Sequence, residues 1–169
     1  MRLLSLLVLW SLVATAHAQE STTEEAIYLP HGIMASHVIQ RPAAAVWGLI
    51  SDWNNLGRIA PGGVKRTVMT GSGPTATWVI STQTGLDVPE RMVSYNATLQ
   101  SMTYTMIDPP LPLRNYVGTI NVDPVSETAC VVHFTLNFEA TSDKRAGLMT
   151  AFRDFQEAYF TGIITVLSE

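Results

Sequence analysis

Histidine, cysteine and serine side chains are the first candidates for chemistry in this chain, because metal binding and nucleophilic catalysis depend on them. His31, His37 and His133 are far apart along the chain, and each lacks a companion cysteine or carboxylate at the spacing of metal ligands. We therefore predict no metal site and no cofactor. The same residues give no argument for a Ser-His-Asp catalytic arrangement.

Cys130 is the sole cysteine of the sequence and lies in an apolar run, so it cannot form a disulfide within the chain. We expect a buried, inert thiol, because a reactive thiolate needs a cationic and partly exposed environment. The run Gly71-Ser72-Gly73 is followed by Pro74 and a strand pattern rather than a helix. This context indicates a hairpin turn and argues against a phosphate-binding loop.

Residues 1–18 have the pattern of a secretory signal peptide. Arg2 is followed by a Leu-rich uncharged run, which ends in Ala16-His17-Ala18. We expect cleavage after Ala18 and a secreted or periplasmic protein. A membrane anchor is the alternative, but the run is shorter than the roughly 20 apolar residues that a spanning helix needs. After cleavage, we predict no stable membrane insertion.

The remaining chain fits a polar linker over residues 19–32 and one domain over residues 33–169, a common domain size. The formal net charge is −4 and the basic residues are scattered, so nucleic acid and anionic membrane are poor partners. Asn96-Ala97-Thr98 is a glycosylation sequon, which matters only in a eukaryotic host. The sequence does not indicate an oligomeric state.

The order of secondary structure elements follows from periodicity and from Gly, Pro and Asn punctuation. One strand, two short helices, six strands and one long helix are predicted. The two short helices begin at Pro42 and end at Ile59, and the long helix spans 144–167. The predicted strands are 33–40, 64–70, 75–82, 89–96, 101–108, 115–123 and 128–140.

Six consecutive strands with short links cannot form parallel βαβ units, so this order predicts an α+β fold with one antiparallel sheet and segregated helices. The last strand places Cys130, Val132, Phe134, Leu136 and Phe138 on one side and polar residues on the other. One face should therefore be buried. Seven twisted strands that curl around an aromatic helix readily leave a hollow, which is the default binding site.

Three segments then resemble a known family. They are Glu90-Arg91-Met92-Val93-Ser94-Tyr95, Leu99-Gln100-Ser101-Met102-Thr103-Tyr104, and the run from Pro110 to Ile120. They resemble the polyketide cyclase/dehydrase group of the SRPBCC superfamily, which also includes START lipid-transfer domains, birch-pollen allergens, plant abscisic-acid receptors and the onion lachrymatory-factor synthase. The resemblance implies a helix-grip fold, in which a seven-stranded curved antiparallel sheet surrounds a long C-terminal helix and two short helices follow the first strand.

The resemblance also implies functional positions. Glu90 and Tyr116 match residues that reach into the cavity of the receptors and the synthase, and Lys65 lies near the ligand-sensing lysine of the receptors. A carboxyl group in an apolar hollow would have a raised pKa and could donate or accept a proton. Two readings stay open, because Glu90 could instead pair with Arg91 or Lys65 at the rim while Tyr116 simply packs.

Binding or transport of a small hydrophobic ligand, of lipid, aromatic or polyketide-like type, is the leading functional hypothesis. The alternative is a cyclase, dehydratase or isomerase that uses Glu90 and Tyr116 as acid and base. A third hypothesis is an interaction module that displays the loop 109–114. The proposed ligand-binding residues are Lys65, Glu90, Met92, Met106, Tyr116, Phe134, Phe138, Phe152, Phe155 and Tyr159.

Overall fold

The computed structural model describes residues 26–169. The predicted signal peptide, its cleavage site and the first part of the predicted linker lie outside these residues. In the described part, no helix has both the length and the apolar character needed to cross a membrane.

Seven strands and three α-helices follow one another in the predicted order. The strands are β1 (Leu29–Ile39), β2 (Val64–Thr70), β3 (Thr77–Thr82), β4 (Asp87–Asn96), β5 (Ser101–Met106), β6 (Arg114–Ser126) and β7 (Ala129–Ala140). The helices are α1 (Ala43–Ile50), α2 (Leu56–Ile59) and α3 (Ser142–Val166), with short 3₁₀ turns at Trp53–Asn55 and Gly73–Thr75.

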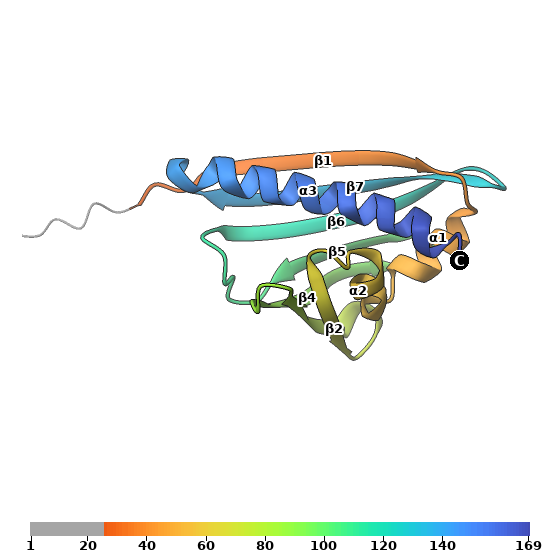
Figure 1. The fold of residues 1–169 in the computed structure, drawn as a ribbon, viewed down its shortest axis with the longest axis horizontal. Coiled ribbons are helices and arrows are strands. Elements are labelled where there is room, and N and C mark those ends of the chain that lie inside the picture. Colours follow the sequence, from red (N-terminus) through yellow and green to blue (C-terminus); the bar gives the residue numbers. More distant parts are fainter. Residues whose placement is uncertain (1–25) are drawn as a thin grey trace, which may run out of the picture.

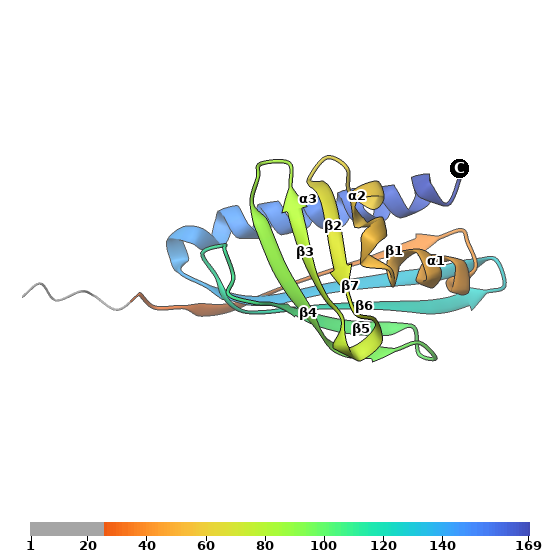
Figure 2. The same cartoon turned by 90° about the horizontal axis from the view of Figure 1, so that it is seen from below.

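The strands form one sheet in the order β1-β7-β6-β5-β4-β3-β2, and every pairing is antiparallel. Helix α3 runs along β1 and β7 (Figure 1). Figure 2 shows that β2, β3 and β4 run steeply across the direction of β1 and β7, so the sheet is strongly twisted. Register shifts in the β2–β3, β4–β5 and β6–β7 pairs accompany this curvature. The predicted α+β helix-grip fold is confirmed.

Several element boundaries differ from prediction, and three of them are informative. Strand β1 begins at Leu29 rather than Ile33, because Leu29 already pairs with Ala140, so residues 29–32 belong to the sheet and not to a linker. Strand β3 begins at Thr77, since the preceding residues form a 3₁₀ turn that includes Pro74. Strand β6 continues past Asp123 to Ser126, where it still pairs with Ala129 of β7.

The predicted two-faced pattern of β7 is confirmed. Cys130, Val132, Phe134, Leu136 and Phe138 are all buried, and burial raises the pKa of the Cys130 thiol, as expected for an inert cysteine. Contacts between rings join this face to α3, because the Phe134 and Tyr159 ring centroids are 5.2 Å apart. The tight core therefore lies between α3 and the β1–β7 side of the sheet.

Gly162 fixes how closely α3 approaches α2. A Cβ atom at position 162 would overlap the backbone carbonyl oxygen of Ile59. Any side chain here would therefore push the two helices apart. The glycine, which weakens an isolated helix, thus permits α3 to close against α2 at its C-terminal end.

Candidate functional site

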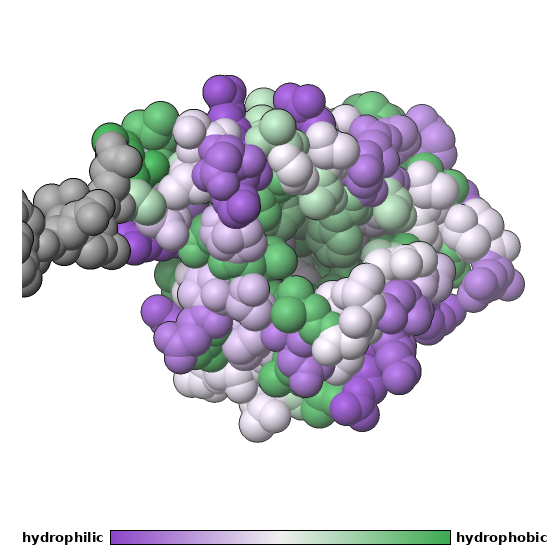
Figure 3. All heavy atoms as spheres, turned by 60° about the vertical axis from the view of Figure 1, so that its left-hand side comes forward, coloured by the Kyte–Doolittle hydropathy of each residue, from purple (hydrophilic) through white to green (hydrophobic). Residues whose placement is uncertain are grey.

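A cavity of about 530 Å³ lies between the middle of α3 and the β2–β4 side of the sheet. Its lining is predominantly apolar, and the space-filling view shows a hollowed surface with hydrophobic residues inside (Figure 3). The lining residues are Ala60, Gly62, Gly63, Val64, Ile80, Thr82, Gln83, Thr84, Val88, Glu90, Met106, Leu111, Tyr116, Ala151, Phe152, Asp154, Phe155 and Ala158. Its size falls within the usual range for small-molecule sites.

Glu90 is the buried carboxyl group of this cavity. It lies on β4 directly opposite Trp78 of β3, and the Trp78 indole Nε1–H donates a 2.7 Å hydrogen bond to Glu90 Oε2. Glu90 is only 2 % exposed. Desolvation raises its pKa from 4.5 to about 8, although the hydrogen bond from Trp78 acts in the opposite direction. Glu90 therefore carries its proton at neutral pH in most molecules.

Aromatic side chains surround Glu90. The Trp53 ring stacks on Trp78 at a centroid distance of 4.4 Å, and the Tyr104 ring packs edge-on against Trp53 at 4.7 Å. Burial raises the pKa of Tyr116 well above its usual value. The nearby Glu90 adds to this, whereas a hydrogen bond with Tyr104 lowers the pKa. Burial also raises the pKa of Tyr104, so both phenols stay protonated near neutral pH.

Gly118 makes room for the Tyr104 ring. The two residues are directly opposite each other on β6 and β5. A Cβ atom at position 118 would lie 2.6 Å from the Tyr104 hydroxyl oxygen, which is far inside contact distance. The glycine therefore lets the Tyr104 ring lie across β6 and hold its hydroxyl next to Tyr116.

Five of the predicted ligand-binding residues line the cavity together: Glu90, Met106, Tyr116, Phe152 and Phe155. Of the two readings of Glu90, the structure supports the one in which it faces the interior, because its carboxyl oxygen accepts a hydrogen bond from Trp78. Arg91 and Lys65, the alternative partners at the rim, are both exposed.

The other five predicted residues lie elsewhere. Lys65 borders a separate, polar hollow together with Arg66 and Asp87, because β2 carries a register shift at this point. Met92 lines a hollow near α1. The remaining three, Phe134, Phe138 and Tyr159, are buried in the core where α3 packs on β1 and β7, and none of them lines this cavity; Phe138 instead borders a smaller hollow near the start of β1.

Trp78 and Tyr104 were not among the site residues predicted from the sequence. Both have a signal that could have found them, because in each strand the residues alternate between the two faces and Trp78 shares the inward face with Ile80. Their partners were harder to predict. The pairings of Trp78 with Glu90 and of Tyr104 with Gly118 depend on cross-strand register, which loop lengths alone did not fix.

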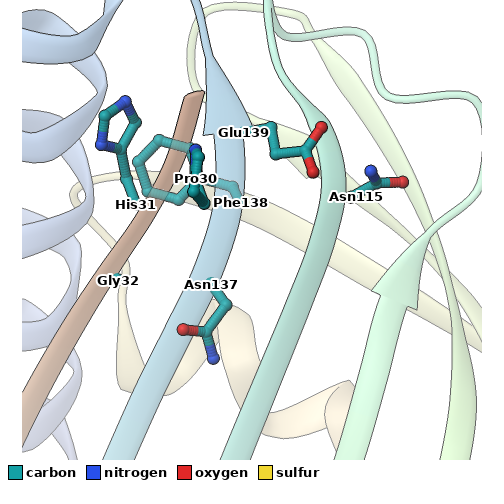
Figure 4. Close-up of a pocket in the computed structure, with 7 residues that line it drawn as sticks. All are labelled: Pro30, His31, Gly32, Asn115, Asn137, Phe138 and Glu139. Atoms are coloured by element: carbon teal, nitrogen blue, oxygen red, sulfur yellow. The ribbon is translucent and has the colours of Figure 1, made fainter. Parts of the chain in front are cut away.

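A smaller hollow of about 350 Å³ lies where β1, β6 and β7 meet near the start of β1 (Figure 4). Its labelled side chains come from these three strands, and most of them are polar. His31 Nε2 is buried without a hydrogen-bond partner. Among the residues that the structure describes, no group of three or more His, Cys, Asp or Glu side chains is placed to hold a metal ion.

A Ser-His-Asp array, which was not predicted from the sequence, crosses the outer face of the sheet. Ser36 Oγ lies 2.7 Å from His133 Nδ1, and His133 Nε2 lies 3.2 Å from an Asp123 carboxylate oxygen. These residues come from β1, β7 and β6. His133 alternates with the inward-facing Phe134, so the array lies on the side of the sheet opposite α3 and the cavity. Because these side chains are partly or fully exposed, the array has the character of a polar ladder between strands.

Solved structures share this fold across most of the chain. A structure of norcoclaurine synthase from Thalictrum flavum in complex with dopamine and hydroxybenzaldehyde matches with a TM-score of 0.68 and 14 % identity, covering 83 % of this chain and 87 % of that one. The Zhui aromatase/cyclase from Streptomyces sp. R1128 matches with a TM-score of 0.72 and 12 % identity, covering 81 % and 93 %. A Thermobifida fusca protein is 26 % identical, with a TM-score of 0.66 and coverage of 76 % and 89 %.

A comparison with curated protein sequences gives no match. The family model described as "Polyketide cyclase / dehydrase and lipid transport", in contrast, matches residues 30–166, which span all seven strands and α3. The chain therefore belongs to the polyketide cyclase/dehydrase and lipid transport family.

Proposed function

We propose that this protein binds a small hydrophobic molecule, of lipid, aromatic or polyketide-like type, in the cavity between α3 and β2–β4, and that it does so outside the cytoplasm. The observation that carries the proposal is the cavity of about 530 Å³, whose apolar lining encloses a single deeply buried carboxyl group. In an apolar cavity, a small number of polar groups fix the orientation of the guest, and apolar contacts supply most of the binding.

The lining combines apolar and polar side chains. Met106, Phe152 and Phe155 offer adaptable apolar contact, and methionine in particular adjusts to guests of varied shape. Glu90 and Tyr116 supply polar groups, which would bind a polar group of the guest. The extracellular or periplasmic location rests on the leader pattern of residues 1–18. N-terminal sequencing of the mature protein from culture medium or periplasm tests it, with Gln19 expected as the first residue.

Ligand retention tests the binding function. Purified protein is incubated with a lipid extract of its host, and native mass spectrometry then identifies the retained species. An Ala158→Trp variant should abolish retention, because Ala158 lines the cavity and a tryptophan there would occupy its volume. Ala146→Trp is the matched control, since Ala146 is an exposed residue of the same helix outside the lining. The binding function is rejected when wild-type protein retains no species and takes up no apolar dye.

An enzymatic function is the second candidate, and the raised pKa of Glu90 beside Tyr116 favours it. A carboxyl group with a pKa of about 8 is suited to exchange a proton with a carbon next to a carbonyl group, while a phenol hydroxyl donates to the carbonyl oxygen. Glu90→Gln should then abolish turnover of the retained ligand without abolishing its binding. Unchanged turnover in this variant would rule the mechanism out.

A further inference from the structure

The ionisable side chains that line the cavity are all acids. They are Glu90 at the inner end, Tyr116 beside it, and Asp154 on the exposed side of α3. Among the described lining residues there is no lysine, arginine or histidine. Lys65 and Arg66, the basic residues that follow Val64 in the chain, are exposed and border the separate hollow next to Asp87. An anionic guest would therefore meet no compensating charge inside the cavity.

Removing a carboxylate from water is unfavourable unless an opposite charge pairs with it. A guest carboxylate in this cavity would face the Glu90 carboxyl group, which carries a proton at neutral pH, and the Tyr116 hydroxyl. Both groups donate hydrogen bonds but neither supplies a positive charge, so the guest would lose its hydration without gaining an ion pair. Long-chain and aromatic carboxylates consequently do not suit this cavity, although their apolar parts would fit it.

The polar groups of the cavity are instead arranged to donate hydrogen bonds. Glu90 Oε2 accepts the Trp78 indole N–H, so the proton of the neutral acid is free to be donated to a guest. Tyr116 comes from β6, two strands from β4, and also lines the cavity. An ammonium group suits these groups less well, because it brings three donors of its own, and the other carboxyl group of the lining, Asp154, lies on the exposed helix face.

We infer that the cavity selects an uncharged guest whose inner end is a hydrogen-bond-accepting oxygen, such as a ketone or other carbonyl group, and that it rejects carboxylates. This inference rests on the proposed binding function and narrows it to a chemical class. It separates two groups of hydrophobic molecules, neutral carbonyl compounds and free acids, that shape and volume alone do not distinguish.

A matched series of naphthalenes tests the inference. The probes are 2-acetylnaphthalene, 2-ethylnaphthalene, 2-naphthoic acid and 2-naphthylmethylamine, which share one ring system and differ in the polar group. Binding is measured by calorimetry below the pH of about 8 at which Glu90 loses its proton. We expect the ketone to bind several-fold more tightly than the hydrocarbon, because the ketone gains one hydrogen bond in the cavity that the hydrocarbon cannot form. The acid should bind at least about tenfold more weakly than the ketone.

The pH dependence of binding, compared between wild-type protein and Glu90→Gln, identifies the responsible group. Trp78 on β3, Tyr104 on β5 and Tyr116 on β6 lie near Glu90, and the exposed Asp154 on α3 lines the same cavity. Only Glu90 changes charge near pH 8, because burial keeps the pKa of both tyrosines well above 10. Ketone binding should therefore weaken as the pH rises through 8 in wild-type protein. It should stay constant in Glu90→Gln, whose amide N–H still donates.

The outcomes separate this inference from the proposed function. Binding of the ketone and the hydrocarbon with equal affinity, or of the acid or amine as tightly as the ketone, would overturn the inference while leaving the binding function intact. Failure of every probe to bind would reject the binding function itself. Lys65→Gln is the control for an external cation, since it should change no affinity; a loss of naphthoic acid binding in this variant would place an anion anchor at Lys65 and overturn the inference.

Discussion

Two groups of ionisable side chains occupy opposite faces of the same sheet. On the inner face, Glu90 is hydrogen-bonded to Trp78 and surrounded by aromatic rings. On the outer face, His133 bridges Ser36 and Asp123, but the His133 and Asp123 side chains are 36 % and 63 % exposed. The outer array has the more familiar residue types for catalysis, whereas the inner group has the cavity and the altered acidity.

The comparison shows that environment outweighs residue type in deciding which group can do chemistry. Removal from water raises the pKa of Glu90 to about 8, even with a hydrogen-bond donor opposing the change. An exposed ion pair, by contrast, remains screened by water and contributes little to stability. The inner group around Glu90 and the outer array around His133 both follow from the alternation of side chains along strands, which places one residue in the core and the next in water.

The largest expected effect concerns the pH dependence of stability. The folded protein holds the Glu90 proton up to about pH 8, whereas the unfolded chain releases it near 4.5. Between these values the unfolded state binds fewer protons, so the free energy of unfolding should fall as the pH rises. The loss is at most about 5 kcal/mol, at about 1.36 kcal/mol for each pKa unit. In Glu90→Gln this decline should be absent.

Urea denaturation between about pH 5 and pH 9 measures this difference. Asp87→Asn is a suitable control, because Asp87 lies on the same strand but is exposed and bonded to Ser81. It should keep the wild-type decline. If Glu90→Gln and wild-type protein lost stability in parallel with rising pH, Glu90 would not be the buried acid that the inner face requires.

An intermediate effect is expected from Gly118→Ala. The added methyl group would force the Tyr104 ring away from β6, and overpacking of this kind costs about 1–3 kcal/mol. Thermal denaturation measures the loss. Gly147→Ala in α3 is the control, since a Cβ atom there meets nothing within 4 Å, and alanine should stabilise the helix slightly. Equal stability of the Gly118 variant and wild type would show that the inner aromatic cluster is loosely packed.

The fold was predictable because its signals are local. Alternation in β7 named the buried face residue by residue, and glycine, proline and asparagine marked the turns between strands. The start of β1 was not predictable in the same way. Residues 29–32 look like a linker in isolation, and they form a strand only because the end of β7 is there to pair with them.

The site was predictable only in part, because it depends on register and on the tilt of one helix. Glu90 and Tyr116 came from family resemblance, and Met106, Phe152 and Phe155 from their apolar character. The same character also pointed to Phe134, Phe138 and Tyr159, which lie outside this cavity, since the sequence does not show that α3 packs on β7 and that the larger cavity lies over β2–β4. The Ser36–His133 contact joins positions 97 residues apart, and no motif connects them.

The smallest effect is expected on the outer face. Asp123→Asn removes the charge that faces His133 but keeps an oxygen that accepts a hydrogen bond. Because both partners are exposed, the free energy of unfolding should fall by only about 0.2–1 kcal/mol, and less at high salt. Chemical denaturation at low and high ionic strength measures it. A loss as large as that of Gly118→Ala, insensitive to salt, would mean that the outer array is shielded from water and would remove the contrast between the two faces.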